Sequence, residues 1–236
     1  MKVSVLVIAH NEEKRIRKCL VSLQNQTKIP DEIVVIAHNC TDNTIKIANE
    51  FSRVRVVACN TKEKGAIYAR IQGFKEVTGD IIACIDGDSY ASPQWIEKIT
   101  KPFKDDLVVG AGGIIWFNGI MANLATIGFF FLDPIFRPTY CFYFWGANFA
   151  VRKSAYNEVG GLEPLIVLKE KLRLHLMPDD AYLSLALMKR GRVVYTRSAP
   201  VYSDDNFSNA KNPVENKGSK QNNDRLALFK HFGLIK

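Results

Sequence analysis

The feature that most constrains the fold is a repeated order in the first 90 residues: an apolar run, a polar loop and then an amphipathic segment. Strands that are apolar throughout and are each followed by a helix are typical of a parallel sheet covered on both faces. The repeat therefore predicts an α/β fold with a Rossmann-like, mostly parallel central sheet and flanking helices. The apolar runs are residues 3–9, 32–37, 54–59 and 80–86.

The first amphipathic segment predicts a helix. Apolar residues from Ile16 to Leu23 recur at the i, i+3, i+4 and i+7 positions of one helical face. Asn11 is expected to be its N-cap, and Glu12 and Glu13 suit the positive end of the helix dipole. The predicted helix therefore starts directly after the first strand.

Ligands of such sheets bind at the carboxyl ends of the strands, so the loops that begin there are the candidate site. No glycine-rich dinucleotide motif follows the first strand, and no phosphate-binding G-x-x-x-x-G-K-[ST] motif occurs in the chain, which disfavours both of those nucleotide folds. The candidate loops are residues 9–13, 37–44, 60–65 and 86–90.

Residues 107–132 contain no charged side chain and are long enough to span a bilayer. The glycines at the start favour a strand over residues 107–117, and Asn118 and Asn123 interrupt the apolar residues after that strand. Three alternatives stay open for this stretch: a membrane span, a partly exposed apolar helix over residues 118–136 that contacts a membrane or an apolar acceptor, or a helix of the core.

The remaining chain predicts further elements and three segments of one continuous domain. A strand ending at Arg152, a short helix ended by Gly160, a helix over residues 177–191 and a strand over residues 192–203 are expected. After Ser203 the chain is polar and predicts a mobile loop or lid before a short amphipathic helix. The segments are a nucleotide-sugar-binding half (1–106), an acceptor-binding half (107–203) and a mobile C-terminal tail (204–236).

Charge and cysteine content limit the partners and the compartment. Lys and Arg total 32 against 24 Asp and Glu, and this net charge of +8 indicates an anionic partner, either a phosphate-bearing substrate, a nucleic acid or an acidic membrane. The five cysteines have no zinc-site or disulfide spacing. A reducing, cytoplasmic location is expected, and the N-terminal apolar run is expected to be a strand because it is too short for a signal peptide.

Two carboxylates, Asp86 and Asp88, stand at the end of the fourth apolar run. On an extended segment both point the same way, and such close like charges should raise the pKa of one carboxyl unless a cation lies between them. Hard carboxylate oxygens suit Mg²⁺ or Mn²⁺, and Gly87 would let a phosphate approach the backbone. The alternative is a turn with solvated aspartates.

Five ordered segments resemble the family-2 glycosyltransferases of the GT-A fold, an inverting, nucleotide-sugar-dependent group. The resemblance covers residues 3 to about 200 and implies a single GT-A domain. The segments are "VSVLVIAHNEE", "EIVVIAHNCTDNT", "KGAIYARIQGF" with "GDIIACIDGDS", "GANFAVRKSAYNEVGGLE" and "DDAYLSLALMKRG".

The resemblance implies a donor site for a UDP- or GDP-sugar. Asp88 would bind the metal, Mn²⁺ or Mg²⁺, and Asp86 the metal or the ribose. His10 stands where the family often has Tyr, and Ala37 and His38 replace an aspartate that contacts uracil or ribose, so uridine specificity is not implied. The implied donor-binding residues are Ala9, His10, Asn11, Glu12, His38, Asn39, Asp42, Lys64, Arg70, Asp86 and Gly87.

On the acceptor side the resemblance implies that Asp180 is the general base, with Asp179 as the alternative. Both could instead cap the helix that they start. Gly146, Ala147 and Asn148 would line the acceptor, although Asn148 could instead satisfy a buried strand end.

The sequence thus predicts transfer of one sugar to an acceptor hydroxyl, since the Q-x-x-R-W signature of polymer synthases is missing. Asp204 or Asp205 is a weaker candidate metal ligand. The acceptor, lipid-linked or glycan, stays open, as do peripheral contact with the inner face of the membrane and the oligomeric state. Nucleic acid is not expected as a partner. Two alternatives are a sugar-phosphate nucleotidyltransferase and a non-catalytic module that binds nucleotide sugars or a membrane surface.

Overall fold

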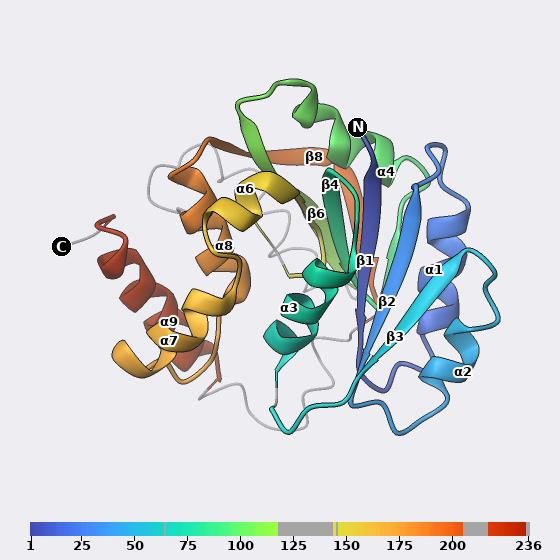
Figure 1. Cartoon of the computed structure of the whole chain (residues 1–236), viewed down its shortest axis with the longest axis horizontal. Coiled ribbons are helices and arrows are strands. Elements are labelled where there is room, and N and C mark those ends of the chain that lie inside the picture. The colour runs from blue at the N-terminus through green and yellow to red at the C-terminus, as the bar shows by residue number, and fades with distance from the viewer. Residues whose placement is uncertain (64, 118–143, 145, 205–216, 235–236) are drawn as a thin grey trace.

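The computed structural model describes most of the 236 residues, and its elements are drawn in Figure 1. For residues 217–222 only the backbone is considered. The described residues are 1–63, 65–117, 144, 146–204 and 217–234.

Four parallel strands form one half of the sheet in the order β3-β2-β1-β4. The central two are buried on both faces because nearly every position is Val, Ile, Leu or Ala. This half confirms the predicted β–α repeat. The strands are β1 (Val3–Ala9), β2 (Glu32–His38), β3 (Val54–Cys59) and β4 (Ile81–Asp86).

The described strands continue into a mixed second half, giving one eight-stranded sheet of order β3-β2-β1-β4-β7-β6-β8-β5. The pairs β4–β7, β7–β6 and β8–β5 are antiparallel, and β6–β8 is parallel. The strands are β5 (Ser89–Ala91), β6 (Val108–Phe117), β7 (Phe149–Arg152) and β8 (Arg192–Ser203).

The short link between β4 and β5 shows that the sheet curls. Only Gly87 and Asp88 separate the two strands, so Asp86 and Ser89 are at most roughly 11 Å apart. In the sheet order, β7, β6 and β8 lie between β4 and β5. If the sheet were flat, the four strand-to-strand distances would separate β4 from β5 by about 19 Å. The carboxyl end of β4 therefore lies beside the far edge of the sheet, and both border the same site.

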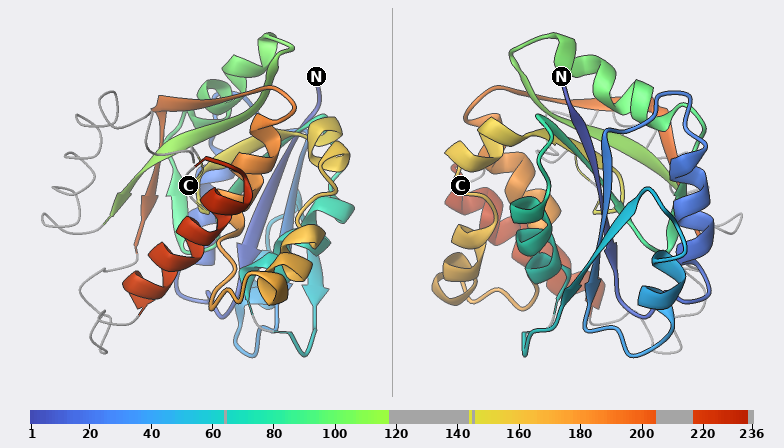
Figure 2. Two further views of the ribbon diagram at one scale, coloured as in Figure 1. Left: turned by 90° about the vertical axis from the view of Figure 1, so that its left-hand side faces the viewer. Right: turned by 45° about the vertical axis from the view of Figure 1, so that its right-hand side comes forward.

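Helices cover both faces of the sheet, as predicted (Figures 1 and 2). α1 (Ile16–Gln24), α2 (Thr44–Ala48) and α4 (Trp95–Thr100) pack on the face that carries Val3, Val5 and Val7. The opposite face is covered by α3 (Ala66–Glu76), α6 (Lys153–Glu158), α7 (Glu163–Lys171), α8 (Asp179–Met188) and α9 (Lys217–His231), and a 3₁₀ turn, η1 (Lys101–Lys104), follows α4.

α3 lies very close to the sheet because Gly73 has no side chain. A Cβ at this position would come within 2.4 Å of a methyl group of Leu6 and within 3.1 Å of Ile36. This close approach fixes the height of α3 above β1 and β2, and with it the position of the side chains on its preceding turn.

The predicted cap of α1 is wrong. α1 begins at Ile16, and the backbone N–H groups of Arg15 and Ile16 donate to the carbonyl of Glu12 instead. Asn11 adopts a positive φ of 55°, and its side-chain oxygen accepts a hydrogen bond from the Thr41 N–H at 2.8 Å. Asn11 therefore joins two loops, and neither Glu12 nor Glu13 lies in the first helical turn.

Several predictions concern residues outside the described part of the chain. They include the apolar segment 118–136, most of the predicted lid and Cys141. Cys19, Cys40, Cys59 and Cys84 are free thiols. Of the helices formed by described residues, none is both long and apolar enough to cross a membrane. α7 and β5 were not predicted.

Glu32 ties the start of β2 to its neighbours and carries a testable prediction. Its Oε1 accepts hydrogen bonds from Ser4 Oγ, Thr78 N and Thr78 Oγ1 at 2.5, 2.6 and 2.7 Å. Burial opposes ionisation, but these hydrogen bonds and the charge of Lys2 outweigh it and lower the pKa of Glu32 below its ordinary value.

We expect Glu32→Gln to lower the free energy of unfolding at pH 7 by about 1–2 kcal/mol. Because the folded-state pKa is lowered, this stabilisation exists above the unfolded pKa and disappears as the pH falls through the folded value, below about pH 4. Urea denaturation at pH 7 and below about pH 4 measures this difference in the free energy of unfolding. Glu50→Gln, which breaks only the exposed pair with Arg17, should cost at most about 0.5 kcal/mol. Equal losses for both variants would contradict the assignment.

Candidate active site

The loops after β1, β2 and β4 meet at one edge of the sheet, as predicted for a parallel arrangement. Gly87 is buried there, and its N–H donates to the carbonyl of Ile8 at 2.7 Å. A Cβ on Gly87 would lie 3.1 Å from the Cβ of Ala9. This glycine therefore lets the chain turn tightly against β1 and places Asp86 and Asp88 on either side of the turn.

Asp88 stands between the turn and the edge strand. Its side-chain Oδ1 accepts a hydrogen bond from Ser89 Oγ at 2.9 Å, and its carbonyl accepts one from the Asp204 N–H at 3.3 Å. Asp204, the weaker candidate ligand, is held by Lys18, whose Nζ lies 2.9 Å from both carboxylate oxygens and 3.6 Å from the centre of the Tyr90 ring. The structure therefore brings Asp204 next to Asp88 but engages it with a lysine. Asp205 lies outside the described residues.

Arg70 of α3 is the centre of the site. Its side chain is 6% exposed and bridges three partners: Nη1 donates to Asp179 Oδ2 at 2.5 Å, and Nη2 donates to Asp86 Oδ1 at 3.1 Å and to the Gly146 carbonyl at 2.9 Å. Its buried Nε has no hydrogen-bond partner among the described residues. One guanidinium thus connects the two carboxylate pairs that the sequence singled out.

Arg70 does not balance the negative charge around it. Burial opposes its ionisation, but Asp179 and Asp86 outweigh burial and raise its pKa, so it is always charged. Burial raises the pKa of Asp86 to about 6; Arg70 opposes that rise, while the like charges of Asp88 and Asp179 add to it. The site therefore holds an excess of carboxylates over cations.

Asp179 and Asp180 occupy the first turn of α8, where the sequence placed them. The Asp180 N–H donates to Asp179 Oδ1 at 3.2 Å, and Asp180 Oδ1 accepts from the Ala181 N–H at 2.7 Å. Asp180 Oδ2 lies 3.6 Å from Nη2 of Arg225, a residue of α9. Burial and the charge of Asp179 raise the pKa of Asp180, and Arg225 opposes the rise. Asp179 is thus held by Arg70 through a short ion pair, whereas the contact between Asp180 and Arg225 is longer.

Two histidines lie between the first and second loops. His10 Nδ1 is 2.7 Å from the carbonyl of His38, and the two ring centres are 6.2 Å apart. Burial lowers the pKa of His38, so its ring is neutral at pH 7. Asn39, with a positive φ of 50°, bonds the backbone of Thr61 through both its amide oxygen and its amide nitrogen. All three residues therefore lie together on the first two loops of the sheet edge, and their contact with a nucleoside stays a prediction.

The side chains of Asp42 and Glu12 bind other residues of the first and second loops. Asp42 accepts from Thr44 N and Thr44 Oγ1 and from the Glu13 N–H, at 3.0, 2.5 and 3.0 Å. Glu12 is paired with Arg15 at 2.7 Å. These contacts make Asp42 a structural link between two loops, and its contact with a nucleoside stays a prediction. Lys64 lies outside the described residues.

The segment 146–148 lies against both halves of the site. A Cβ on its first residue, Gly146, would lie 2.9 Å from Arg70 Nη2, so a larger residue here would displace the guanidinium. Ala147 is half-buried. Asn148 is fully buried: it donates to the carbonyls of Ile114 and Ala199 at 2.7 and 2.9 Å and accepts from Trp95 Nε1 at 2.8 Å. This geometry favours the structural alternative for Asn148.

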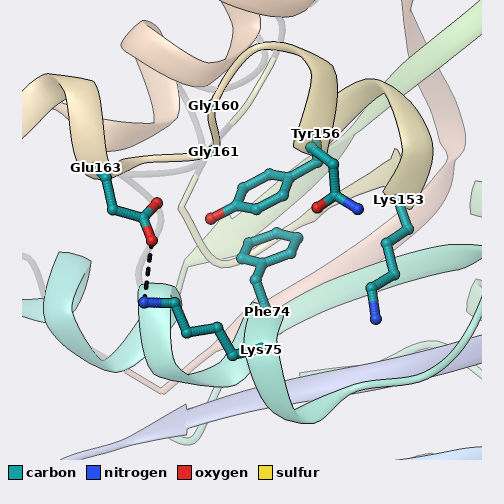
Figure 3. A pocket seen from close by; sticks show the side chains of 8 residues that line it. Phe74, Lys75, Lys153, Tyr156, Gly160, Gly161 and Glu163 are labelled. Atoms are coloured by element: carbon teal, nitrogen blue, oxygen red, sulfur yellow. Dashed lines mark ion pairs between the residues drawn. The ribbon is translucent and has the colours of Figure 1, made fainter.

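A cavity of about 360 Å³ lies apart from these residues (Figure 3). Phe74 and Tyr156 stack there with ring centres 3.8 Å apart, and Lys75 pairs with Glu163 at 3.1 Å. Lys153, another lining residue, bonds the backbone before β4, at the end of the sheet opposite Asp86. The cavity therefore belongs to a different part of the fold from the predicted site.

The donor set at the sheet edge fits a hard divalent cation. Asp86 keeps one third of its side chain exposed, and Asp86 and Asp88 offer hard carboxylate oxygens on either side of the Gly87 turn. Within the described residues, no group of three or more His, Cys, Asp or Glu side chains could by itself hold a metal. A cation here would therefore complete its shell with substrate oxygens and water, as Mg²⁺ commonly does.

Two residues with a place in this site, Lys18 and Arg225, were not predicted. Lys18 lies on α1, and Arg225 lies on α9, 45 residues beyond the carboxylate that it approaches, since Asp180 and Arg225 form the pair. Neither is part of a local motif. Only the three-dimensional arrangement brings them to the carboxylates.

Removing Arg70 tests the central junction. We expect Arg70→Met to lower the free energy of unfolding by about 3–5 kcal/mol, because Asp86 and Asp179 lose their buried counter-charge. Urea denaturation at pH 7 measures the loss. The matched control is Arg55→Met, which breaks the surface pair with Glu76 and should cost no more than about 1 kcal/mol. Similar losses for the two variants would show that Arg70 is no more important to the fold than a surface arginine.

Comparison with known proteins gives the family. A sequence model described as glycosyl transferase family 2 matches residues 4–160. A glucosyl-dolichyl phosphate glucuronosyltransferase of Haloferax volcanii is 25% identical over 225 residues, covering 85% of this chain and 68% of that protein. A dolichol-phosphate mannosyltransferase of Pyrococcus furiosus is 34% identical over 117 residues, covering 47% of this chain and 33% of that protein. The chain thus spans two thirds of the first relative and one third of the second.

Solved structures give the fold. A mannosyltransferase of Pyrobaculum calidifontis, in complex with GDP-Man and Mn²⁺, matches 88% of this chain and 58% of its own with a TM-score of 0.68 at 17% identity. Glucosyl-3-phosphoglycerate synthase of Mycobacterium tuberculosis, with Mn²⁺, UDP-glucose and phosphoglyceric acid, matches 100% of this chain and 81% of its own with a TM-score of 0.68 at 16% identity. Both the predicted family and the predicted fold are confirmed. The chain belongs to glycosyl transferase family 2 and has the GT-A fold.

Proposed function

We propose that this chain transfers one sugar from a nucleoside diphosphate sugar to an acceptor hydroxyl, with inversion at the anomeric carbon. The observation that carries the proposal is the Arg70 junction, because it joins Asp86, on the predicted donor side, to Asp179, next to the predicted base. Donor and acceptor machinery thereby share one buried cation. Membership of glycosyl transferase family 2 supports the reaction class.

Asp88 and Asp86 would hold a divalent cation, Mn²⁺ or Mg²⁺. When bound, the cation would neutralise charge on the diphosphate leaving group. Arg70 orients Asp86 from the protein side and keeps its Oδ1 in place. Support comes from the excess of carboxylates at this edge and from the Mn²⁺ in the structures of both GT-A relatives.

Asp180 is the general base of the proposed reaction. It takes the proton of the acceptor hydroxyl, the acceptor oxygen forms a bond to the anomeric carbon, and the bond to the diphosphate oxygen breaks with its electron pair leaving on the nucleoside diphosphate. Burial and Asp179 raise the pKa of Asp180, which makes it a stronger base than an exposed aspartate. Asp179, held by Arg70 at 2.5 Å, acts as a fixed neighbour.

The donor is a UDP- or GDP-sugar, and its nucleoside lies over the loops that carry Ala9, His10, His38 and Asn39. The neutral ring of His38, whose Nε2 lies 3.3 Å from Asn39 Nδ2, would border the base or ribose. Lys64 is proposed to face the diphosphate. The two GT-A relatives, bound to GDP-Man and UDP-glucose, leave the choice of base open for this chain.

The proposed acceptor is a polyprenyl-type lipid phosphate or a glycan carried on one. Two relatives have names that contain a dolichyl or dolichol phosphate, and the net charge of +8 would favour an anionic membrane surface. The protein would then work in the cytoplasm, at the inner face of the membrane.

One assay tests the function against its alternatives. The protein is incubated with Mn²⁺, a panel of UDP- and GDP-sugars and lipid phosphate acceptors, while release of nucleoside diphosphate and the anomeric configuration of the product are followed. Inverted product supports the proposal. Pyrophosphate formed from a sugar phosphate and a nucleoside triphosphate would indicate a nucleotidyltransferase, and nucleotide binding without any turnover would indicate a binding module.

The role of Asp180 gives a second prediction for this site. Asp180→Asn should lower kcat by at least about 100-fold, because the amide cannot accept the hydroxyl proton, while the affinity for the nucleotide stays within about twofold. Asp106→Asn, at a side chain that is 100% exposed, is the control and should keep full activity. Full activity of Asp180→Asn would move the base to Asp179 or elsewhere.

Asp88→Asn tests the metal ligand in a binding experiment. Calorimetric titration with nucleoside diphosphate should show that Mn²⁺ strengthens binding to the unaltered protein but not to the variant, since one hard anionic ligand is missing. Binding without metal should be the same for both. If Mn²⁺ strengthens nucleotide binding equally in both proteins, Asp88 is not a ligand.

A further inference from the structure

Two neighbouring residues of α9 hold the start of α8 from outside. Asp224 is 2% exposed, and its Oδ1 and Oδ2 accept hydrogen bonds from the backbone N–H groups of His175 and Leu176 at 3.0 and 2.6 Å. These two N–H groups precede the carboxylate pair by only a few residues. A buried carboxylate that caps free backbone donors fixes the path of the chain at that point.

Arg225, the next residue of α9, approaches the carboxylate of Asp180. Its Nη2 lies 3.6 Å from Asp180 Oδ2, and the two side chains are only 16% and 13% exposed. Because Asp180 Oδ1 already accepts the Ala181 N–H, Oδ2 is the oxygen that can take a proton from an acceptor. The contact is longer than a hydrogen bond, so it stabilises charge on Oδ2 while leaving the oxygen able to accept.

α9 is firmly packed in the orientation that these contacts need. Leu228 and Phe229 are 0% and 8% exposed in the core shared with α8, and the Phe232 ring meets the Tyr182 ring edge-on at 5.9 Å. Lys189, at the end of α8, lies 4.7 Å above the Phe232 ring. Figures 1 and 2 show α9 beside α8. Arg225 lies near the middle of α9 in the sequence.

Resting on the proposed function, we propose that Arg225 is a positioning residue for Asp180 and that α9 holds the general base in its working geometry. Asp224 fixes the backbone that leads into α8, and Arg225 fixes the charge and direction of the carboxylate. α9 thereby becomes part of the catalytic machinery although it contributes no group to the reacting atoms.

The environment of Asp180 gives the expected pH effect. The charged groups that face it are Asp179 from its own helix, Arg70 from α3 and Arg225 from α9. Asp179 raises the pKa of Asp180, as burial does, and the two arginines lower it. Without Arg225 the carboxylate therefore ionises only at higher pH, and the acidic limb of the pH–rate profile moves upward.

The test uses the full chain with Arg225→Gln, Arg225→Lys and the exposed control Lys230→Gln. Arg225→Gln should lower kcat about 10- to 100-fold, leave nucleotide affinity unchanged and shift the acidic limb of kcat upward by about one pH unit. Low millimolar guanidinium should restore part of the rate, and Arg225→Lys should keep more activity than Arg225→Gln. Wild-type kcat and pH profile in Arg225→Gln would overturn the proposal.

A second measurement separates this inference from the proposed function. Amide hydrogen exchange at residues 175–181 should be faster in Asp224→Asn and in Arg225→Gln than in the unaltered protein and in Lys230→Gln, whether or not a substrate has been found. If the unaltered protein transfers no sugar, the proposed function fails while this readout still tests the contact. Unchanged exchange in both α9 variants would show that α9 does not hold the carboxylate segment.

Discussion

The site depends on one buried guanidinium. Arg70 faces Asp86, Asp179 and the Gly146 carbonyl, while Asp88 and Asp180 stand next to the two carboxylates that it binds. A buried cation with two carboxylates is stable only when each group keeps its partners, so these segments can hardly move independently. Arg70 carries one positive charge against the two carboxylates that it binds, so it does not neutralise that pair. On the proposed function, this excess of negative charge is what makes the sheet edge receptive to a divalent cation and its diphosphate.

Two glycines leave the space that the position of the Arg70 guanidinium requires. Gly73 lets α3 lie against β1 and β2, and Gly146 lets the carbonyl of its own segment come within 2.9 Å of Arg70. The curl of the sheet brings the β4 turn to the edge strand, so Asp88 and Asp204 become neighbours. Each adjustment is local, but together they let strands from both halves of the chain border one site.

The sequence predicts the parts of this structure that are encoded locally. The β–α repeat, the loop after residue 86 and a helix with Asp179 and Asp180 in its first turn follow from periodicity and from residue type, and the structure has them. The ion pairs at the centre of the site are non-local. Arg70 and Asp179 are 109 residues apart, and no pattern in either segment predicts that the two side chains pair. The cap prediction for Asn11 was wrong for a related reason. The Asn11 side chain accepts a hydrogen bond from Thr41 in another loop, and a capping pattern in the local sequence cannot reveal such a contact.

The two carboxylates of α8 illustrate how a chain can give adjacent like charges different tasks. Asp179 and Asp180 repel each other, and that repulsion would raise the pKa of whichever has no cation. The structure gives each its own arginine, at 2.5 Å from α3 and at 3.6 Å from α9. The short pair holds Asp179 against Arg70, whereas the longer contact leaves Asp180 Oδ2 beyond hydrogen-bond distance of Arg225. Because the two arginines come from distant parts of the chain, the proposed base has its full set of charged neighbours only when the whole domain is assembled.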